Sequence, residues 1–91
     1  MIVRQPSGGA VRLTFALPAD RYEGRISVVG DFNGWRPGRH TLVRRAGGVR
    51  SVAVTVARNS THRFRYLGEG GHWFDDPEAD AHTPDGGLVR V

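Results

Sequence analysis

The feature that most constrains the fold is a two-residue alternation of apolar and polar side chains, interrupted at roughly ten-residue intervals by turn-forming residues. In residues 11–17 every odd position is apolar and most even positions are polar, which predicts a strand with one buried face. Strands of the same kind are predicted at residues 25–30, 41–45, 49–57, 62–67, 72–75 and 88–91. No segment of useful length repeats with the period of a helix.

The 91 residues are enough for one domain, and 13 glycines and five prolines supply the many turns that short strands need. We therefore expect residues 11–91 to form a single all-β domain, an antiparallel β-sandwich of about seven strands. Residues 1–10 are expected to be a flexible N-terminal arm. Ile26, Val28, Phe64 and Tyr66 are expected to face inward, together with the odd positions of residues 11–17 and the valines of residues 52–56.

The charge balance is basic, with 13 cations against nine acids and a net charge of +4, and every cation is an arginine. Such a balance raises the question of a nucleic-acid partner. The strand arginines are expected at outward positions all round the sandwich, as a solvated surface layer; they are Arg12, Arg25, Arg44, Arg50, Arg63 and Arg65. Nucleic-acid binding would instead need basic side chains gathered on one face, so we expect no nucleic-acid partner.

Cysteine is absent, which excludes disulfides, zinc thiolate sites and thiol catalysis. The first six residues hold no apolar run of signal-peptide length, and no later run approaches the ~18 residues of a membrane span. We expect a cytoplasmic chain with no membrane partner.

Two tryptophans stand at the edges of predicted loops. In residues 30–35, three turn formers and two aromatic residues follow a strand directly, and two arrangements are open. Either Phe32 and Trp35 both close the end of the sandwich, or Phe32 packs inward while Asn33 and Gly34 turn the chain so that Trp35 faces solvent. Trp73 follows a glycine-rich turn on a very short strand, where a buried position is less expected.

Exposed indoles suit a sugar ligand, because one face of a pyranose ring is apolar and flat while its hydroxyl edge is polar. A planar guanidinium offers forked donors for those hydroxyls. Arg65, outward on the strand before Trp73, is the candidate for this role.

Three motifs resemble the family 48 carbohydrate-binding modules, in that family's order and spacing. They are Gly30-Asp31-Phe32-Asn33-Gly34-Trp35, Phe64-Arg65-Tyr66-Leu67, and Trp73-Phe74-Asp75-Asp76-Pro77-Glu78-Ala79-Asp80. These modules are immunoglobulin-like "early-set" domains that occur beside isoamylase and glycogen-branching enzymes and in the β subunit of AMP-activated protein kinase. The resemblance covers about residues 11–91 and implies that fold.

The resemblance also implies a function, the binding of α-1,4-linked glucans such as glycogen, starch and maltooligosaccharides without cleavage. By the same resemblance Trp35 and Trp73 would stack on glucose rings and Arg65 would contact hydroxyls, while Asn33 and Gly34 set the turn that aims Trp35. The chain departs from the family at its tail, residues 83–88, where an Asn is usual; Thr83 or Asp85 would have to replace it. No cofactor or metal is required.

Three alternatives remain beside glucan binding. Catalysis by Asp75 and Asp76 is disfavoured, because neighbours on a strand point to opposite faces, and Asp76 before Pro77 fits a turn in which its side chain accepts from the backbone. No Ser, His and Asp arrangement is evident in the sequence. His62, His72 and His82 are spaced too far apart to predict a metal site. The strongest alternative is a structural or protein-interaction domain with little sugar affinity that assists a glycogen-metabolising enzyme.

Overall fold

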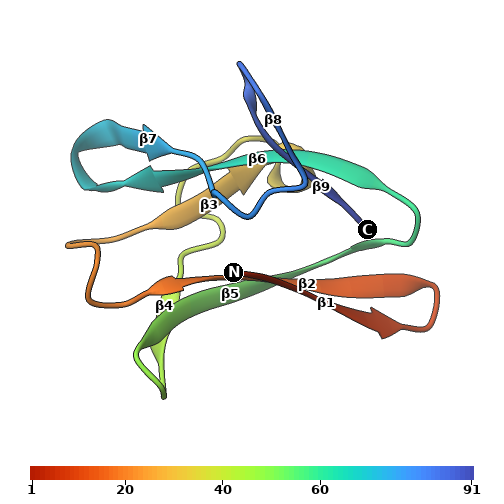
Figure 1. The fold of residues 1–91 in the computed structure, drawn as a ribbon, viewed down its shortest axis with the longest axis horizontal. Helices are drawn as coiled ribbons and strands as arrows, with labels where there is room; N and C mark the ends of the chain where they lie inside the picture. Colours follow the sequence, from red (N-terminus) through yellow and green to blue (C-terminus); the bar gives the residue numbers. More distant parts are fainter.

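A computed structural model describes all 91 residues and shows two antiparallel sheets packed face to face (Figure 1). The nine strands are β1 (Ile2–Ser7), β2 (Ala10–Pro18), β3 (Ser27–Gly30), β4 (Val43–Arg45), β5 (Val49–Ala57), β6 (Thr61–Gly68), β7 (His72–Phe74), β8 (Ala81–Thr83) and β9 (Gly86–Arg90). Two short 3₁₀ turns, η1 (Asp31–Asn33) and η2 (Glu69–Gly71), are the only helical segments. No helix has the length and apolar character that crossing a membrane would need.

The sheets have the strand orders β1-β2-β5-β4 and β3-β6-β9-β8, and β7 pairs with β6 beyond the end of β9. Without the short β7 and β8, this is the order of an immunoglobulin constant-type sandwich, four strands facing three. The predicted antiparallel β-sandwich is confirmed. All seven predicted strands are present, and β1 and β8 are additional.

The core lies between the sheets and follows the alternation in the sequence. Leu13 and Phe15 from β2 and Phe64 and Tyr66 from β6 are fully buried. The Phe15 and Phe64 ring centroids lie 4.9 Å apart, which is contact distance for tilted aromatic pairs. The inward positions predicted for β2, β3 and β6 are confirmed.

The predicted N-terminal arm is ordered and forms β1, an edge strand paired antiparallel with β2 along its whole length. Arg4 ties this strand to the opposite sheet, since its Nη2 lies 2.6 Å from Asp80 Oδ2 and its Nε donates to the Arg90 carbonyl at 2.8 Å. Residues 2–7 therefore form an edge strand where a flexible arm was predicted, because pairing with β2 and the contacts of Arg4 hold them in place. The six residues themselves carry no clear alternation.

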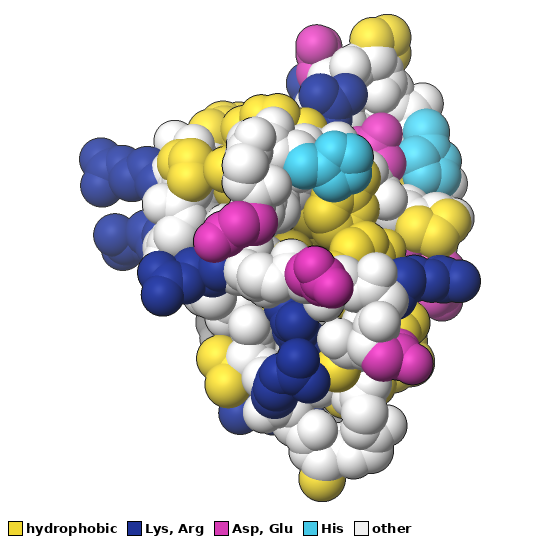
Figure 2. Space-filling model, turned by 90° about the vertical axis from the view of Figure 1, so that its left-hand side faces the viewer, with side chains coloured by type: hydrophobic (Ala, Val, Ile, Leu, Met, Phe, Trp, Pro, Cys, Tyr) yellow, Lys and Arg dark blue, Asp and Glu magenta, His cyan; other side chains and the backbone are white.

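One arginine assigned to the solvated layer is buried. Arg50 is only 7% exposed, and it faces Leu17 across the β2–β5 pair. It shares the inward parity of Val52, Val54 and Val56 on β5, so the outward assignment was wrong. Elsewhere basic and acidic side chains are interspersed, as on the face shown in Figure 2.

Candidate functional site

Trp35 stands on the loop after β3, directly beyond η1. Gly34 ends η1 with a φ of 67°, and Trp35 follows with a φ of 59°, so two successive residues are left-handed and turn the chain sharply. The Trp35 amide donates to the Gly30 carbonyl at 2.9 Å. The Phe32 ring packs inward against Phe15, with centroids 5.7 Å apart, whereas Trp35 is 40% exposed. Of the two arrangements considered for this loop, the structure therefore has the one with Trp35 at the surface.

The buried side chain of Asn33 stabilises the Trp35 loop through hydrogen bonds. Its side chain is 7% exposed, accepts from the Gly30 amide at 3.1 Å and donates to the Val28 carbonyl at 3.0 Å. Its amide nitrogen also lies 3.1 Å from His40 Nδ1. Since that nitrogen has only hydrogens to offer, His40 Nδ1 accepts and the ring is neutral in this arrangement.

The surroundings of His40 also favour its neutral form. Burial, and then the charge of Arg39, lower the pKa of His40 below its ordinary value of 6.5. The residue was not identified from the sequence, where an isolated histidine before a strand gives no signal.

Trp73 lies on β7, which extends the second sheet beside β6. It faces Leu67 across the β6–β7 pair, so its side chain is on the outer face of the sheet, opposite the core face that holds Tyr66. Trp73 is 45% exposed. Its neighbour Phe74 points the other way and stacks on Tyr22 with centroids 4.9 Å apart, which fixes the short strand.

Arg65 is on the same outer face, two residues from Leu67 on β6. Its guanidinium is already engaged, because Nε donates to Asp75 Oδ1 at 3.2 Å and Nη2 donates to the Pro84 carbonyl at 2.6 Å. Of five N–H groups, three remain for a ligand. Asp75 is thus an anchor for Arg65, a role not predicted from the sequence although Trp73 and Asp75 share a parity.

The tail near Arg65 forms a tight turn. Thr83 Oγ1 donates to the Gly86 carbonyl at 2.8 Å and accepts from the Asp85 amide at 3.2 Å. Its hydroxyl therefore holds the β8–β9 turn.

Asp76 is buried, with 1% of its surface exposed. It accepts from the Tyr66 hydroxyl at 2.7 Å and, as the sequence predicted, from the backbone amide two residues on, that of Glu78, at 2.8 Å. Burial, and next the charge of Asp76, raise the pKa of Tyr66 far above its ordinary value of 10.0. Because Asp75 is bound to Arg65 on the outer face, the two neighbouring carboxylates lie on opposite sides of the sheet, as expected.

The structure brings a Ser, a His and an Asp together that the sequence analysis did not connect. His62 Nδ1 lies 2.7 Å from Asp31 Oδ1, and His62 Nε2 lies 2.8 Å from Ser60 Oγ. The order of contacts is that of a hydrolytic triad. However, the Ser60 hydroxyl donates to the Ala57 carbonyl, so its proton is directed away from His62. We read this chain of bonds as a brace between η1 and the β5–β6 turn.

His72 and His82 are separate from this brace and from each other. His82 Nε2 contacts the Asp76 carbonyl at 2.8 Å, and the His72 ring stacks on Phe74. The structure contains no group of three or more histidines and carboxylates arranged to hold a metal ion.

The predicted site residues lie in two places along the second sheet. Trp73 and Arg65 share the outer face of the β3-β6-β9-β8 sheet, and Trp35 stands on a loop at the far end of β3. Ser27, at the near end, is level with Leu67 and hence with Trp73, whereas Gly30, before the Trp35 loop, is level with Phe64. Three residue steps separate these levels, roughly 10 Å along the strand. The two indoles therefore stand at different levels along the sheet.

The fold and these surface residues define the class of the protein: a small immunoglobulin-like β-sandwich with two exposed tryptophans and an anchored arginine. No protein-family model matches the sequence. Comparison with curated proteins relates the chain to a short part of 1,4-alpha-glucan branching enzymes. It is 44% identical over 62 residues to the 1,4-alpha-glucan branching enzyme GlgB of Salinibacter ruber, a stretch that covers 66% of this chain and 10% of that enzyme.

Two further relatives have the same description. The 1,4-alpha-glucan branching enzyme GlgB 2 of Xanthomonas campestris pv. campestris is 60% identical over 42 residues, 46% of this chain and 6% of the enzyme. The GlgB of Cupriavidus pinatubonensis is 41% identical over 64 residues, 67% of this chain and 8% of the enzyme. The chain thus spans a tenth or less of each relative. These matches relate the chain to a short segment of 1,4-alpha-glucan branching enzymes.

Proposed function

We propose that this chain is a non-catalytic module that binds α-1,4-linked glucans such as glycogen, starch and maltooligosaccharides. Trp35 and Trp73 are the stacking platforms, and the free N–H groups of Arg65 donate to sugar hydroxyls. Asn33 and Gly34 act through Trp35, by holding the turn that presents it. The observation that carries the proposal is the exposure of both indoles, 40% and 45%.

Exposing these rings is costly, which is why they are informative. A tryptophan removes a large apolar area from water when it is buried, and the four phenylalanines and two tyrosines of this chain are all buried or half-buried. Only the two indoles stay open among the aromatic side chains. A flat apolar surface with a nearby forked donor matches the apolar face and hydroxyl edge of a pyranose.

The sites are shallow, so the affinity for a single short chain is expected to be modest. A polysaccharide offers many ends and repeated units, and binding to it gains from avidity. Polymer retention is therefore a more sensitive assay than titration with a short oligosaccharide.

The test is electrophoresis in native gels cast with and without glycogen. We expect the wild-type chain to be retarded by glycogen and Trp35→Ala and Trp73→Ala each to lose most of that retardation. Val43→Ala is the matched control, because Val43 is also an exposed apolar side chain, 50% open, but lies at the edge of the other sheet. Wild-type migration unaffected by glycogen would refute binding, and equal retardation of wild type and both tryptophan variants would refute the site.

The second candidate function is a structural or protein-interaction domain that assists a glycogen-metabolising enzyme. The short share of the branching enzymes that the chain matches, 6–10% of their length, favours it, since such a segment can serve as a spacer. This candidate predicts no retardation by glycogen, together with binding to a branching enzyme that survives both tryptophan substitutions.

A further inference from the structure

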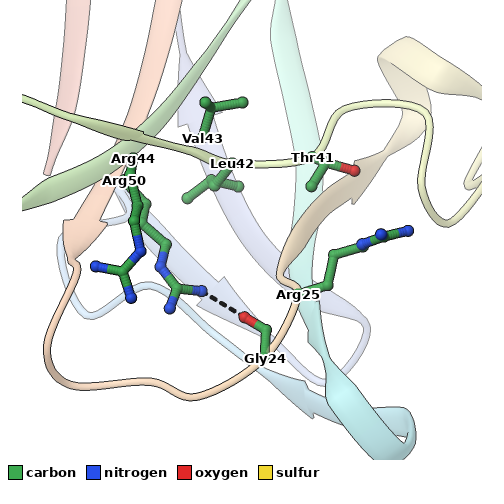
Figure 3. Close-up of a pocket in the computed structure, with 7 residues that line it drawn as sticks. All are labelled: Gly24, Arg25, Thr41, Leu42, Val43, Arg44 and Arg50. Carbon is green, nitrogen blue, oxygen red and sulfur yellow. Dashed lines mark hydrogen bonds between the residues drawn. The ribbon is translucent and has the colours of Figure 1, made fainter.

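A second feature of the surface lies between β4 and the chain entering β3. A hollow of about 460 Å³ opens there, within the range of small-molecule sites. Its lining residues are Gly24, Arg25, Thr41, Leu42, Val43, Arg44 and Arg50 (Figure 3). Three of the seven are arginines, and none is acidic.

Arg50 is the buried member of this set. Its guanidinium is held by two backbone carbonyls, since Nη1 donates to that of Gly24 and Nη2 donates to that of Tyr22 at 2.9 Å. Its Nε is buried and has no hydrogen-bond partner. Carbonyl groups orient a guanidinium but carry no net charge, so the positive charge of this 93%-buried residue is not neutralised by the protein. Buried charges are normally paired.

Arg44 increases this excess of positive charge. It is directly opposite Arg50 in the β4–β5 pair, and Figure 3 shows the two guanidinium groups side by side. Like charges at directly opposed strand positions destabilise a sheet. Only Arg4 and Arg65 among the arginines have a carboxylate within 4.0 Å, so neither Arg44 nor Arg50 has one. Arg25 borders the hollow on its other side.

We propose that this hollow binds a phosphate group, with Arg44 and Arg50 as its two cationic ligands. Two adjacent guanidinium groups are best matched by a ligand with two negative charges, which a phosphate carries near neutral pH and a single carboxylate does not. Guanidinium forks match phosphate oxygens in geometry. The rest of the hollow, toward Arg25, accommodates the organic part of a phosphate monoester, so the class of ligand is a small phosphorylated metabolite.

The test is titration of the ¹⁵N-labelled chain, followed by NMR, with inorganic phosphate, a hexose phosphate and the unphosphorylated hexose at constant ionic strength. We expect both phosphates, and not the hexose, to shift the Arg44 and Arg50 signals, and the hexose phosphate to bind more tightly than inorganic phosphate. Arg44→Gln should weaken the binding of both phosphates by about tenfold or more, since one charge-assisted hydrogen bond is worth roughly that factor. Arg44 is exposed, so this variant should fold.

Arg45→Gln is the matched control. Arg45 is the next residue, faces Val49 across the β4–β5 pair, and donates to Ser51 Oγ instead of lining the hollow; its loss should change the affinity less than twofold. A malonate titration decides the ligand class: binding of this dicarboxylate as tightly as phosphate overturns the phosphate assignment. An equal loss of affinity in both arginine variants, or no shift with either phosphate, overturns the site itself. Trp35→Ala should bind phosphate normally, which separates this test from that of glucan binding.

Discussion

Removing the side chain of Asn33 should loosen the loop that presents Trp35 without unfolding the sandwich. Asn33→Ala deletes three hydrogen bonds, from the Gly30 amide, to the Val28 carbonyl and to His40. Each is worth about 1 kcal/mol net, and the first two lie in a buried setting. We therefore expect a loss of roughly 3 kcal/mol in the free energy of unfolding.

This loss is large but should not be lethal, because domains of this size are commonly stable by about 5–15 kcal/mol. At about 4–8 °C per kcal/mol for a small domain, the melting temperature should fall by roughly 12–24 °C. Thermal and urea unfolding followed by circular dichroism measure both quantities. At 20 °C the variant should remain folded while its retardation by glycogen drops to that of Trp35→Ala.

The matched control is Asn59→Gly. Asn59 is likewise a turn asparagine, with a φ of 58°, but its side chain is exposed and makes no hydrogen bond in the structure. We expect its free energy of unfolding to stay within about 0.5 kcal/mol of wild type, as for most surface changes. A loss below about 1 kcal/mol for Asn33→Ala would refute the role of Asn33 as the support of the loop. Undiminished glycogen retention by a folded Asn33→Ala would refute its link to Trp35.

Two further predictions concern the same surface. The lowered pKa of His40 means that folding favours its neutral form, so its contribution to stability is full above pH ~6.5 and is lost as the pH falls toward the lowered value. Urea midpoints should show this loss in wild type and lack it in His40→Gln; identical pH profiles would contradict it. Arg65→Lys should keep part of the glycogen retention and Arg65→Gln should lose it, at a stability cost of about 1 kcal/mol or less because the pair with Asp75 is partly exposed. Equal retention by both Arg65 variants would exclude a charged donor at this position.

The strands were predictable because alternation is a local property of the sequence. All seven predicted segments contain strands of the sandwich, and the inward residues of β2, β3 and β6 are those that the pattern indicated. β1 and β8 were missed for a common reason. Both are edge strands. They form because they pair with β2 and β9, and their own residues show no alternating pattern.

The site was predictable in its residue types and less so in its connections. That Arg65 points outward follows from strand parity, but its partners Asp75 and Pro84 lie 10 and 19 residues away, and pairing over such distances depends on the β6–β7 and β8–β9 registers. Asp31 and His62 are in contact but lie 31 residues apart in the sequence. This contact could not be predicted from the sequence either. Arg50 is different: its parity with Val52 was readable, and the error came from assuming that a charged side chain must face water.

The conformation of Trp35 is hard to explain by a structural role alone. Trp35 and Asn59 are the only non-glycine residues with positive φ, and asparagine tolerates that region far better than a bulky side chain does. For Trp35 the left-handed backbone costs roughly 1–2 kcal/mol, and the residue also leaves 40% of its surface open to water. A spacer domain would gain from a glycine here, because glycine would remove both the strain and the exposed apolar area. A module that needs an indole aimed at a flat apolar ligand gains from the tryptophan despite both costs. Since backbone strain of this kind concentrates at ligand-binding positions, the strained Trp35 favours glucan binding over the spacer alternative.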